Sequence, residues 1–172
     1  MYKRQVYAVS YDLLSRSTAL DLPSGMNDIS YTYDLLGRVL TVAYSGHTLT
    51  VVWDALGRST SVTGPLGTIS YQYDLAGHRT RMTWPDSFYV VYDYDLAGEV
   101  TKERENGATS GDGVLATYAY DDFGRRMTLT RGNGVVTTYT FDSASRLTGL
   151  AQDLASTGSD QTYTLTLSLI HI

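Results

Sequence analysis

The sequence predicts an all-β protein built from tandem antiparallel β-hairpins that together form a strip of sheet. Three observations carry this prediction: a short motif recurs about every 20 residues, aromatic residues stand two apart before most copies, and turn-forming residues lie midway between copies. Recurrence at such a period is typical of repeat proteins, in which each unit is stabilised by its neighbours.

The recurring motif is an aromatic residue, an aspartate, two variable residues, a glycine and usually a basic residue. Seven copies are present, and the structural motif residues of the five clearest are Tyr33, Asp34, Gly37 and Arg38; Trp53, Asp54, Gly57 and Arg58; Tyr73, Asp74 and Gly77; Tyr94, Asp95 and Gly98; and Tyr120, Asp121, Gly124 and Arg125. Two further copies begin at Tyr11 and Phe141, and there Ser15 and Ser145 stand in place of the glycine.

The core of the motif has the residue preferences of a tight turn. An aspartate in first place can accept a hydrogen bond from the backbone two residues on, and a glycine in fourth place permits a positive φ. This arrangement commonly closes a hairpin with a glycine bulge. We therefore expect a turn at each copy, and a strained or rebuilt turn at Ser15 and Ser145.

The flanks of each turn are predicted to be strands. Tyr31 and Tyr33 stand two apart before one turn, and Leu40 and Val42 stand two apart after it, so each pair lies on one sheet face. About 20 residues hold two strands and two turns. The second set of turns is expected at Gly46, residues 64–67, residues 85–87 and residues 132–134, with a loop insertion at residues 106–113 on the rim opposite the motif turns.

The domain organisation follows from the repeats. Residues 11–150 hold the seven repeats, residues 1–10 precede them without the pattern, and residues 151–172 form a degenerate strand and a tail. The opening MYKRQ and the closing LSLIHI depart from the pattern between them. We expect both to be translated adapter sequence that flanks a fragment; ordinary termini are the alternative.

Composition excludes several classes of protein. The chain has 15 tyrosines, no cysteine and a formal net charge of −5. Disulfide and thiolate chemistry are therefore excluded, an acidic chain without a basic cluster does not suit a nucleic acid, and no apolar run is long enough for a membrane span. The tyrosines predict half-buried sheet surface or a recognition surface.

Two pairs of acidic residues are candidate metal sites. Asp93 and Asp95 flank Tyr94 and could chelate a metal on one face of a strand, but a pair of solvated carboxylates is the favoured interpretation. The same holds for Asp121 and Asp122. The motif aspartates are assigned to turns, and no metal or cofactor is expected.

The arginines that follow the turns form a row that could bind anionic glycans or phosphates. They are Arg16, Arg38, Arg58, Arg125 and Arg146. Pairing with aspartate across strands or stacking on tyrosine is the favoured alternative. The tyrosines could stack on sugars, but sheet core is favoured for them.

Neither the histidines nor any known catalytic sequence motif predicts a catalytic site in this chain. His47, His78 and His171 lack ligand spacing, and His78 occupies an arginine position of its repeat. No Gly-x-Ser-x-Gly, phosphate loop or dinucleotide fingerprint is present. The chain is therefore expected not to be an enzyme.

The seven copies from Tyr11 to Leu150 closely resemble the YD repeats of the Rhs family, which Tc toxin complexes and teneurins share. The resemblance implies a strip of hairpins that spirals into a hollow shell. In bacterial members the shell encloses a toxic C-terminal domain and delivers it to another cell; in teneurins a related shell belongs to a cell-surface adhesion protein. Residues 151–172 contain no Asp-Pro-x-Gly-type cleavage segment of the kind that bacterial members carry.

Three hypotheses follow. The first is a structural segment of a shell that encapsulates the C-terminal effector of a secreted or contact-delivered bacterial toxin, with the rest of its own shell and that effector as partners. The second is a cell-surface adhesion or carbohydrate-binding array with glycans as partners. The third and weakest is an enzyme whose site joins Asp93, Asp122 and a histidine. The chain alone is expected to fold poorly and to aggregate through exposed sheet edges.

Overall fold

The structure is a computed structural model that describes residues 7–23, 28–155, 158 and 160–165. These residues confirm the predicted all-β fold, because the strands follow one another in the sheet in chain order from β1 to β15. The segments MYKRQ and LSLIHI, and His171 with them, lie outside the described residues. The chain divides into two compact units, residues 1–72 with 82–87 and residues 73–81 with 88–172.

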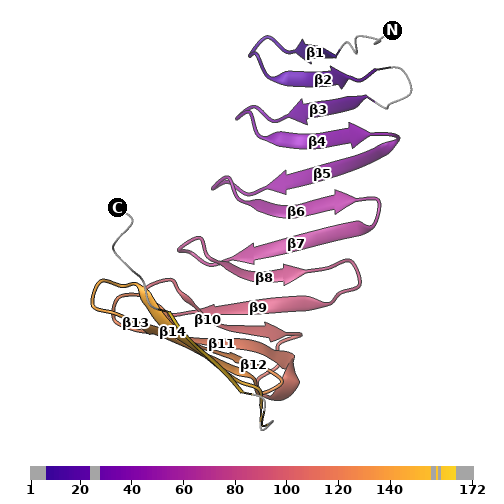
Figure 1. Cartoon of the computed structure of the whole chain (residues 1–172). Coiled ribbons are helices and arrows are strands. Elements are labelled where there is room, and N and C mark those ends of the chain that lie inside the picture. The colour runs from indigo at the N-terminus through magenta and orange to yellow at the C-terminus, as the bar shows by residue number, and fades with distance from the viewer. Residues whose placement is uncertain (1–6, 24–27, 156–157, 159, 166–172) are drawn as a thin grey trace. The chain divides into compact units, whose positions relative to one another are not determined.

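The first unit holds seven strands of four to seven residues (Figure 1). They are β1 (Ala8–Tyr11), β2 (Ser17–Asp21), β3 (Ile29–Tyr33), β4 (Val39–Tyr44), β5 (His47–Trp53), β6 (Ser59–Gly64) and β7 (Gly67–Tyr73), whose last residue belongs to the second unit. Each is paired antiparallel with the next. The following strand β8 (Arg79–Thr83) contributes residues to both units.

The second unit continues the same succession of antiparallel strands. Its strands are β9 (Tyr89–Tyr94), β10 (Val100–Glu105), β11 (Val114–Tyr120), β12 (Arg126–Arg131), β13 (Val136–Phe141), β14 (Leu147–Asp153) and β15 (Gln161–Thr164). The predicted insertion is the connection from β10 to β11, and it carries a short 3-10 turn, η1 (Gly111–Gly113). No helix among the described residues is long and apolar enough to cross a membrane.

Two kinds of connection alternate along the chain. The motif turns, called YD turns below, close β1–β2, β3–β4 and β5–β6 in the first unit and β9–β10, β11–β12 and β13–β14 in the second. The connections at the other ends of these strands are called far loops. In the first unit the YD turns gather along one long edge and the far loops along the opposite edge (Figure 1). The predicted alternation of strand, YD turn, strand and variable loop is confirmed.

The strand register gives each unit two chemically different faces, because directly paired residues point to the same side of a sheet. In the first unit one face carries a threonine row that crosses five strands: Thr32 pairs with Thr41, Thr41 with Thr50, Thr50 with Thr63 and Thr63 with Thr68. The other face carries rows such as Tyr31–Val42–Leu49. We call these the threonine face and the aromatic face.

The second unit repeats this division. Thr128 pairs with Thr138 on one side, whereas Tyr118 pairs with Leu129 on the other. The alternation of residues along each strand therefore sorts large rings from small hydroxyl groups, as the period of two requires.

Burial corrects one interpretation made from the sequence. Within the described part of the chain, Val90 and Ala116 are the buried apolar residues, each 6% exposed, and Thr137 is the buried polar residue. The tyrosines among the described residues are half-buried or exposed rather than core residues. A single sheet buries side chains only against their neighbours on the same face, whereas a core needs a second layer. The aromatic face is therefore a surface of the strip.

Candidate functional site

The YD turns are the candidate site because the motif concentrates its recurring residues there. In the turn that follows β3, Gly37 donates its backbone N–H to the oxygen of Asp34 at 3.1 Å, and Asp34 donates to the oxygen of Arg38 at 2.9 Å. The pairing register of β3 and β4 shifts between Thr32 and Tyr33. Gly37 has a φ of +82°. These features are those of a tight turn followed by a glycine bulge.

The carboxylate of Asp34 stabilises the turn through hydrogen bonds to groups within it. Its Oδ1 accepts hydrogen bonds from the backbone N–H groups of Leu36 and Arg38, each at 2.9 Å. Its Oδ2 accepts from Nε of Arg38 at 2.6 Å. One aspartate therefore satisfies two backbone donors and one guanidinium, which explains why the motif needs an acid in this place and a base four residues later.

These contacts lower the pKa of the turn aspartates. For Asp54 the largest cause is the hydrogen bond from the backbone of Arg58, which outweighs partial burial and holds the pKa below its ordinary value. For Asp34 burial is the larger single effect and acts upward, but the backbone and side-chain bonds from Arg38 together lower the pKa. The pKa is lowered likewise at four more turns, at Asp12, Asp74, Asp121 and Asp142.

The two turns that lack glycine keep the same hydrogen bonds and are strained rather than rebuilt. Ser15 donates to the oxygen of Asp12 at 3.0 Å, and Ser145 donates to that of Asp142 at 3.0 Å. Both serines have a positive φ, 60° and 61°, a conformation that disfavours side chains with a Cβ atom. The local sequence thus dictates the turn even where its preferred residue is missing.

Arg16 and Arg38 also reach forward to the next YD turn. Nη1 of Arg16 donates to the backbone oxygen of Asp34 at 3.0 Å, and Nη1 of Arg38 donates to that of Asp54 at 3.0 Å. The same guanidinium groups lie over the next motif ring, 4.8 Å from the centre of Tyr33 and 5.4 Å from that of Trp53. One arginine therefore binds its own turn and covers the following one.

The aromatic ring of the motif makes a hydrogen bond in the opposite direction, to the backbone of the preceding hairpin. The hydroxyl of Tyr33 donates to the backbone oxygen of Ser17 at 2.6 Å, and Nε1 of Trp53 donates to that of Val39 at 2.8 Å. Each acceptor is the residue directly after the preceding arginine. We call the forward arginine contact and the backward ring contact together the clasp. It joins hairpins through side chains where the sheet joins them through backbone groups.

The second unit contains the same clasp with variations. Tyr120 donates to the backbone oxygen of Val100 at 2.9 Å. Nη1 of Arg125 donates to the backbone oxygen of Asp142 at 3.3 Å and lies 5.0 Å from the centre of the Phe141 ring. Phe141 has no hydroxyl, so this clasp has its forward half alone.

Two turns of the second unit replace the arginine. His78 contacts Asp74 through Nδ1 at 2.9 Å and stacks on the ring of Tyr94 at 4.7 Å, as expected of a turn substitute. Glu99 instead places an acid beside Asp95. Burial raises the pKa of Glu99 above its ordinary value, and the charge of Asp95 raises it further. The turn at Asp95 therefore places two acidic side chains side by side, where the other YD turns pair an acid with a base or a histidine.

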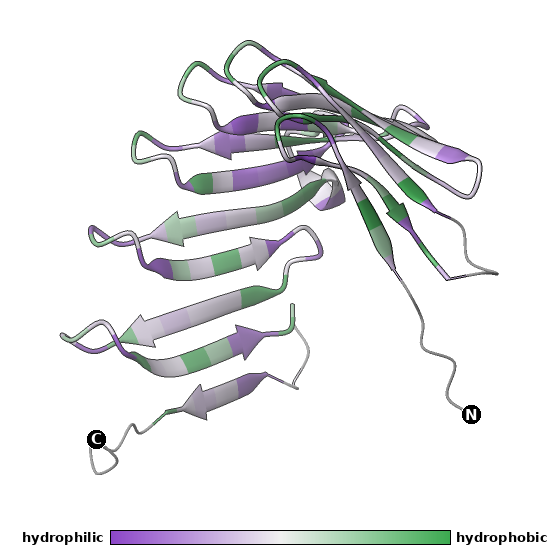
Figure 2. Cartoon of the chain, turned by 90° about the horizontal axis from the view of Figure 1, so that it is seen from above, coloured by the Kyte–Doolittle hydropathy of each residue, from purple (hydrophilic) through white to green (hydrophobic). Residues whose placement is uncertain are grey.

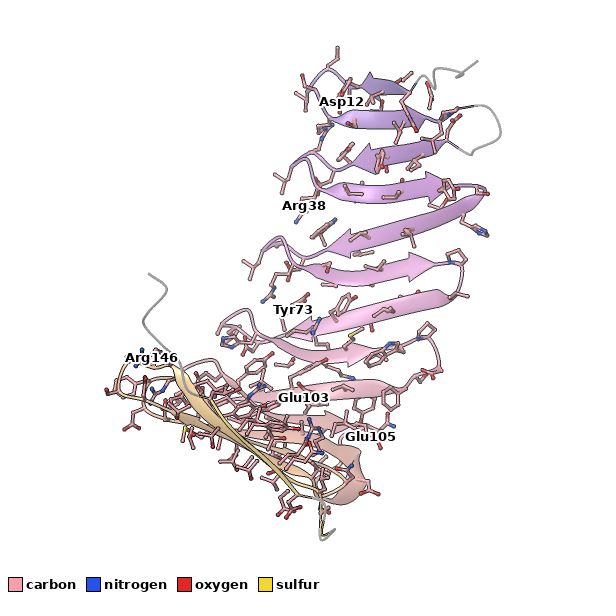
Figure 3. All side chains as sticks on the ribbon, viewed as in Figure 1. Asp12, Arg38, Tyr73, Glu103, Glu105 and Arg146 are labelled. Atoms are coloured by element: carbon pink, nitrogen blue, oxygen red, sulfur yellow. The ribbon has the colours of Figure 1, made fainter. Side chains whose placement is uncertain are left out.

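Figure 3 shows the labelled Asp12 and Arg38 at the YD-turn edge of the first unit. The arginines were expected to pair with aspartate or to stack on rings. All five pair with aspartate, and Arg16, Arg38 and Arg125 also lie over the next motif ring. The pairing differs in one respect from the expectation: the partner is the aspartate of the same turn, four residues earlier, as in the ion pairs of Arg16, Arg38, Arg58, Arg125 and Arg146.

Asp93, which was expected to be a solvated carboxylate, is 39% exposed and is also held in an ion pair with Arg104. Arg104 donates to its two oxygens, from Nε at 2.8 Å and from Nη2 at 2.7 Å, and this two-pronged contact raises the pKa of Arg104. Arg104 lies on the strand that pairs with the strand of Asp93, which the sequence alone does not reveal. Asp95 and Asp121 bind their own turns, while Asp122 is exposed. No group of three or more acidic or histidine side chains suited to a metal occurs in the residues that the structure covers.

Sequence reasoning missed the two variable positions of the motif. In several turns these are leucines whose side chains project into solvent, among them Leu35 and Leu96, which are fully exposed. Figure 2 colours several turn loops as hydrophobic. The signal was present in the sequence as a leucine directly after four of the seven motif aspartates, at Leu13, Leu35, Leu75 and Leu96.

Comparison with known proteins places these features in context. The sequence profile of the family described as Teneurin YD-shell matches residues 1–160. The crystal structure of TcdB2-TccC3 without hypervariable C-terminal region superposes with a TM-score of 0.79 at 17% identity, over 96% of this chain and 10% of that chain. The crystal structure of TcdB2-TccC3 superposes with a TM-score of 0.58 at 17% identity, over 92% and 12%. This likeness shows the fold, and the chain spans about a tenth of the length of the proteins it matches. No curated protein matches the sequence.

Proposed function

Because this chain belongs to the teneurin YD-shell family, we propose that it is a wall segment of a hollow β-shell that encloses the C-terminal effector domain of a bacterial toxin. The observation that carries the proposal is the clasp. It fastens each hairpin to the next at the YD-turn edge, as Arg38 does to Asp54, in addition to the backbone pairing of neighbouring strands.

The clasp explains how a sheet without a core can serve as a wall. An isolated hairpin is marginally stable in water, and the described strands contain few buried residues. Stability in such an array comes from the contacts between neighbouring repeats. The bonds from Arg16 to Asp34 and from Tyr33 to Ser17 are contacts of this kind. They are short, polar and repeated, so that they support a continuous strip of any number of hairpins.

An enclosed effector is the partner that we propose for such a wall. One matching structure is described as lacking a hypervariable C-terminal region, which supports the idea that a variable segment accompanies a shell of this fold. For this chain we propose that the effector carries the chemistry and that the described residues serve a structural role. We propose further that the natural protein acts outside the cell that makes it, by secretion or contact delivery.

A carbohydrate-binding or adhesion array is the competing function. The half-buried rings of the aromatic face would supply stacking surfaces for sugars. The geometry favours it less, because the polar tips of Tyr33, Trp53 and Tyr120 already bind backbone oxygens. Specific binding of a glycan to a natural protein that encloses no effector domain would favour adhesion over encapsulation.

A protease-protection experiment tests the proposal. The complete natural reading frame around these residues is recovered and expressed with an epitope at its C-terminus. We expect the C-terminal segment to survive a protease concentration that degrades the same segment produced alone. Replacement of both Arg38 and Arg125 by alanine, which removes the forward arginine contacts of two clasps, is expected to shorten that survival. Equal digestion of the enclosed and the isolated segment would contradict encapsulation.

A further inference from the structure

A cavity on the threonine face of the second unit collects hydroxyl groups around one lysine. Lys102 pairs with Thr117, and Thr117 pairs with Thr130, so the three side chains lie in one row on the same face. Thr130 stands two residues after Thr128, which places this row on the threonine face. The row lines a shallow cavity of about 340 Å³. We call this cavity the lysine pocket.

The insertion between β10 and β11 forms one wall of the lysine pocket. Thr109 and Ser110 of this insertion line the cavity and add two hydroxyl groups to those of the row. Arg104 fixes the start of the insertion, because its Nη1 lies 3.5 Å from the backbone oxygen of Ala108 while its Nε and Nη2 bind Asp93. The loop that lengthens this repeat therefore shapes a cavity, and loops held on a rigid scaffold commonly carry ligand contacts.

A close contact between the insertion and the next far loop forms a second wall. The backbone N–H of Gly132 donates to the oxygen of Leu115 at 3.2 Å. A Cβ atom at Gly132 would lie 2.5 Å from the backbone oxygen of Val114 and 2.7 Å from that of Asp112, so this approach requires a glycine. Gly132 and Gly134 line the cavity beside the insertion. Backbone contacts therefore fix both walls of the lysine pocket.

Lys102 is half-buried and carries a charge that no described residue neutralises. Its ammonium group makes no hydrogen bond or ion pair within the part of the chain that the structure describes. Asp93, its partner in the neighbouring strand, has both carboxylate oxygens bound by Arg104. Glu103 lies on the aromatic face, where it accepts a hydrogen bond from the hydroxyl of Tyr118 at 3.2 Å. Because a partly buried charge without a counter-ion is unfavourable, a ligand that supplies a negative charge is stabilised here.

The rest of the lining does not offset the charge of Lys102. It contains no acidic residue, and Asp112 of the insertion lies outside it. Arg131 contributes to the lining, but its Nη1 donates to Oγ1 of Thr137 at 3.3 Å. Thr137 belongs to the aromatic face, because it pairs with Leu129. The lysine pocket is therefore a positive, hydroxyl-lined cavity in a chain of net charge −5.

We propose that the lysine pocket binds a small carboxylate that carries hydroxyl groups, of the chemical class of the sugar acids. Lys102 holds the carboxylate through charge-assisted hydrogen bonds. The hydroxyl groups of the lining both donate and accept hydrogen bonds, as those of such a ligand do. The volume of about 340 Å³ lies within the range of about 300–1,000 Å³ that is typical of sites for small molecules. This site is independent of the proposed encapsulation.

The lining does not suit other classes of small ligand. A metal cation is repelled by Lys102 and finds no carboxylate in the lining. A phosphate monoester carries about two negative charges at neutral pH, which one lysine does not balance. A neutral sugar finds no aromatic ring in the lining on which to stack. A single carboxylate together with hydroxyl groups matches what the lysine pocket offers.

Ligand-observed NMR on the natural protein that carries these residues tests the proposal. Glucuronate is the probe, glucose is its neutral analogue and inorganic phosphate is a bare anion. We expect saturation transfer from the protein to glucuronate. Glucose is expected to bind about tenfold more weakly, because it lacks the charged group, and phosphate is expected to compete poorly with glucuronate. No transfer to glucuronate, or binding of either analogue as tight as that of glucuronate, would overturn the assignment.

Substitutions locate the binding in the lysine pocket. Lys102→Gln is expected to weaken glucuronate binding about tenfold, and Lys102→Arg, which keeps the charge, should weaken it less. Thr130→Val removes one hydroxyl from the lining and should weaken binding severalfold. Thr50→Val, the same change in the threonine row of the first unit, is the matched control and should leave binding unchanged.

Circular dichroism of each variant shows whether its fold is kept. If Lys102→Gln fails to fold, Thr130→Val against Thr50→Val decides the question. Glucuronate binding that survives Lys102→Gln, or that falls equally with Thr130→Val and Thr50→Val, would overturn the proposal. Either result leaves the protease-protection test of encapsulation unaffected, so the two proposals fail separately.

Discussion

Arg38 connects two successive hairpins: its Nε lies 2.6 Å from Oδ2 of Asp34 in its own turn, and its Nη1 lies 3.0 Å from the backbone oxygen of Asp54 in the next. A planar guanidinium with several fixed donors can make both bonds at once. A lysine carries one compact charge and cannot reproduce this geometry. The identity of the basic residue, and not only its charge, is therefore part of the repeat.

Replacement of Arg38 by lysine is expected to destabilise the strip although the charge is kept. The forward bond to Asp54 and the contact with the ring of Trp53 are lost. We expect the thermal unfolding midpoint to fall by roughly 2–4 °C, measured by circular dichroism. Thr48→Ser on the threonine face is the control. A lysine variant as stable as the parent would show that the forward bond contributes nothing.

Replacement of the serines in the two strained turns by glycine is expected to stabilise the protein. Ser15→Gly is expected to raise the free energy of unfolding by about 0.5–1 kcal/mol, because it removes a Cβ atom from a positive φ. Ser145→Gly should gain less, since Oγ of Ser145 accepts a bond from Arg125 at 3.1 Å that glycine cannot replace. Urea denaturation of both variants gives the comparison, and equal gains would contradict the role of the Arg125 bond.

Replacement of a turn glycine by alanine distinguishes the cost of backbone strain from the cost of a steric clash. A Cβ atom at Gly37 would lie 3.9 Å from Nη1 of Arg16, which is ordinary contact. Gly37→Ala is therefore expected to destabilise by about 1–2 kcal/mol through its φ of +82° alone. Urea denaturation measures the loss. Gly158→Ala, where no atom lies within 4 Å of an added Cβ, is the control.

Glu99 is expected to weaken the second unit at neutral pH. Its pKa is raised by burial and by Asp95, so its stabilising, protonated form is present below the unfolded pKa and is lost as pH rises through the folded pKa. Glu99→Arg should raise the unfolding midpoint by restoring a clasp, and Glu99→Gln should raise it less by removing the charge alone. Both gains should shrink as the pH is lowered to about 4. A gain that does not change with pH would refute the electrostatic cause.

Acid should weaken the turns that hold aspartate. The pKa values of Asp12, Asp34, Asp54, Asp74, Asp121 and Asp142 are lowered. Their contribution to stability is present above the unfolded pKa of about 4 and is lost as pH falls through the lower folded values. Urea midpoints measured between about pH 5 and pH 2 should therefore decline. Asp34→Asn should be less stable at neutral pH and should show a shallower decline.

The hydroxyl group of the motif ring can be removed in one repeat and added in another. Tyr33→Phe removes the bond to the oxygen of Ser17 and is expected to cost about 0.5–1.5 kcal/mol. Phe141→Tyr places a hydroxyl at the one described motif ring that lacks a donor, and it should be neutral or stabilising. Denaturant titration of both variants is the measurement. Loss of stability in the Phe141 variant would show that the backward half of the clasp does not transfer between repeats.

The local parts of the fold could be predicted from the sequence because they depend on residues close together in the chain. The turn at Asp34 follows from an acid, a glycine and a base within five positions, and the strand faces follow from aromatic residues spaced two apart. These signals needed no knowledge of the hairpins on either side.

The remaining features depend on neighbours in space. Arg38 and Asp54 are 16 residues apart and meet because of the strand register, and Asp93 meets Arg104 for the same reason. The exposure of the tyrosines was misjudged because composition does not reveal how many layers a sheet has. The leucines of the turns were passed over because a turn imposes no requirement on those positions.

Electron cryomicroscopy of the natural protein that carries these residues tests the central claim most directly. The account predicts a closed wall one sheet thick, in which residues 7–165 form part of the strip and density for a C-terminal segment lies inside. A strip whose two faces are both open to solvent, with no enclosed space, would contradict it.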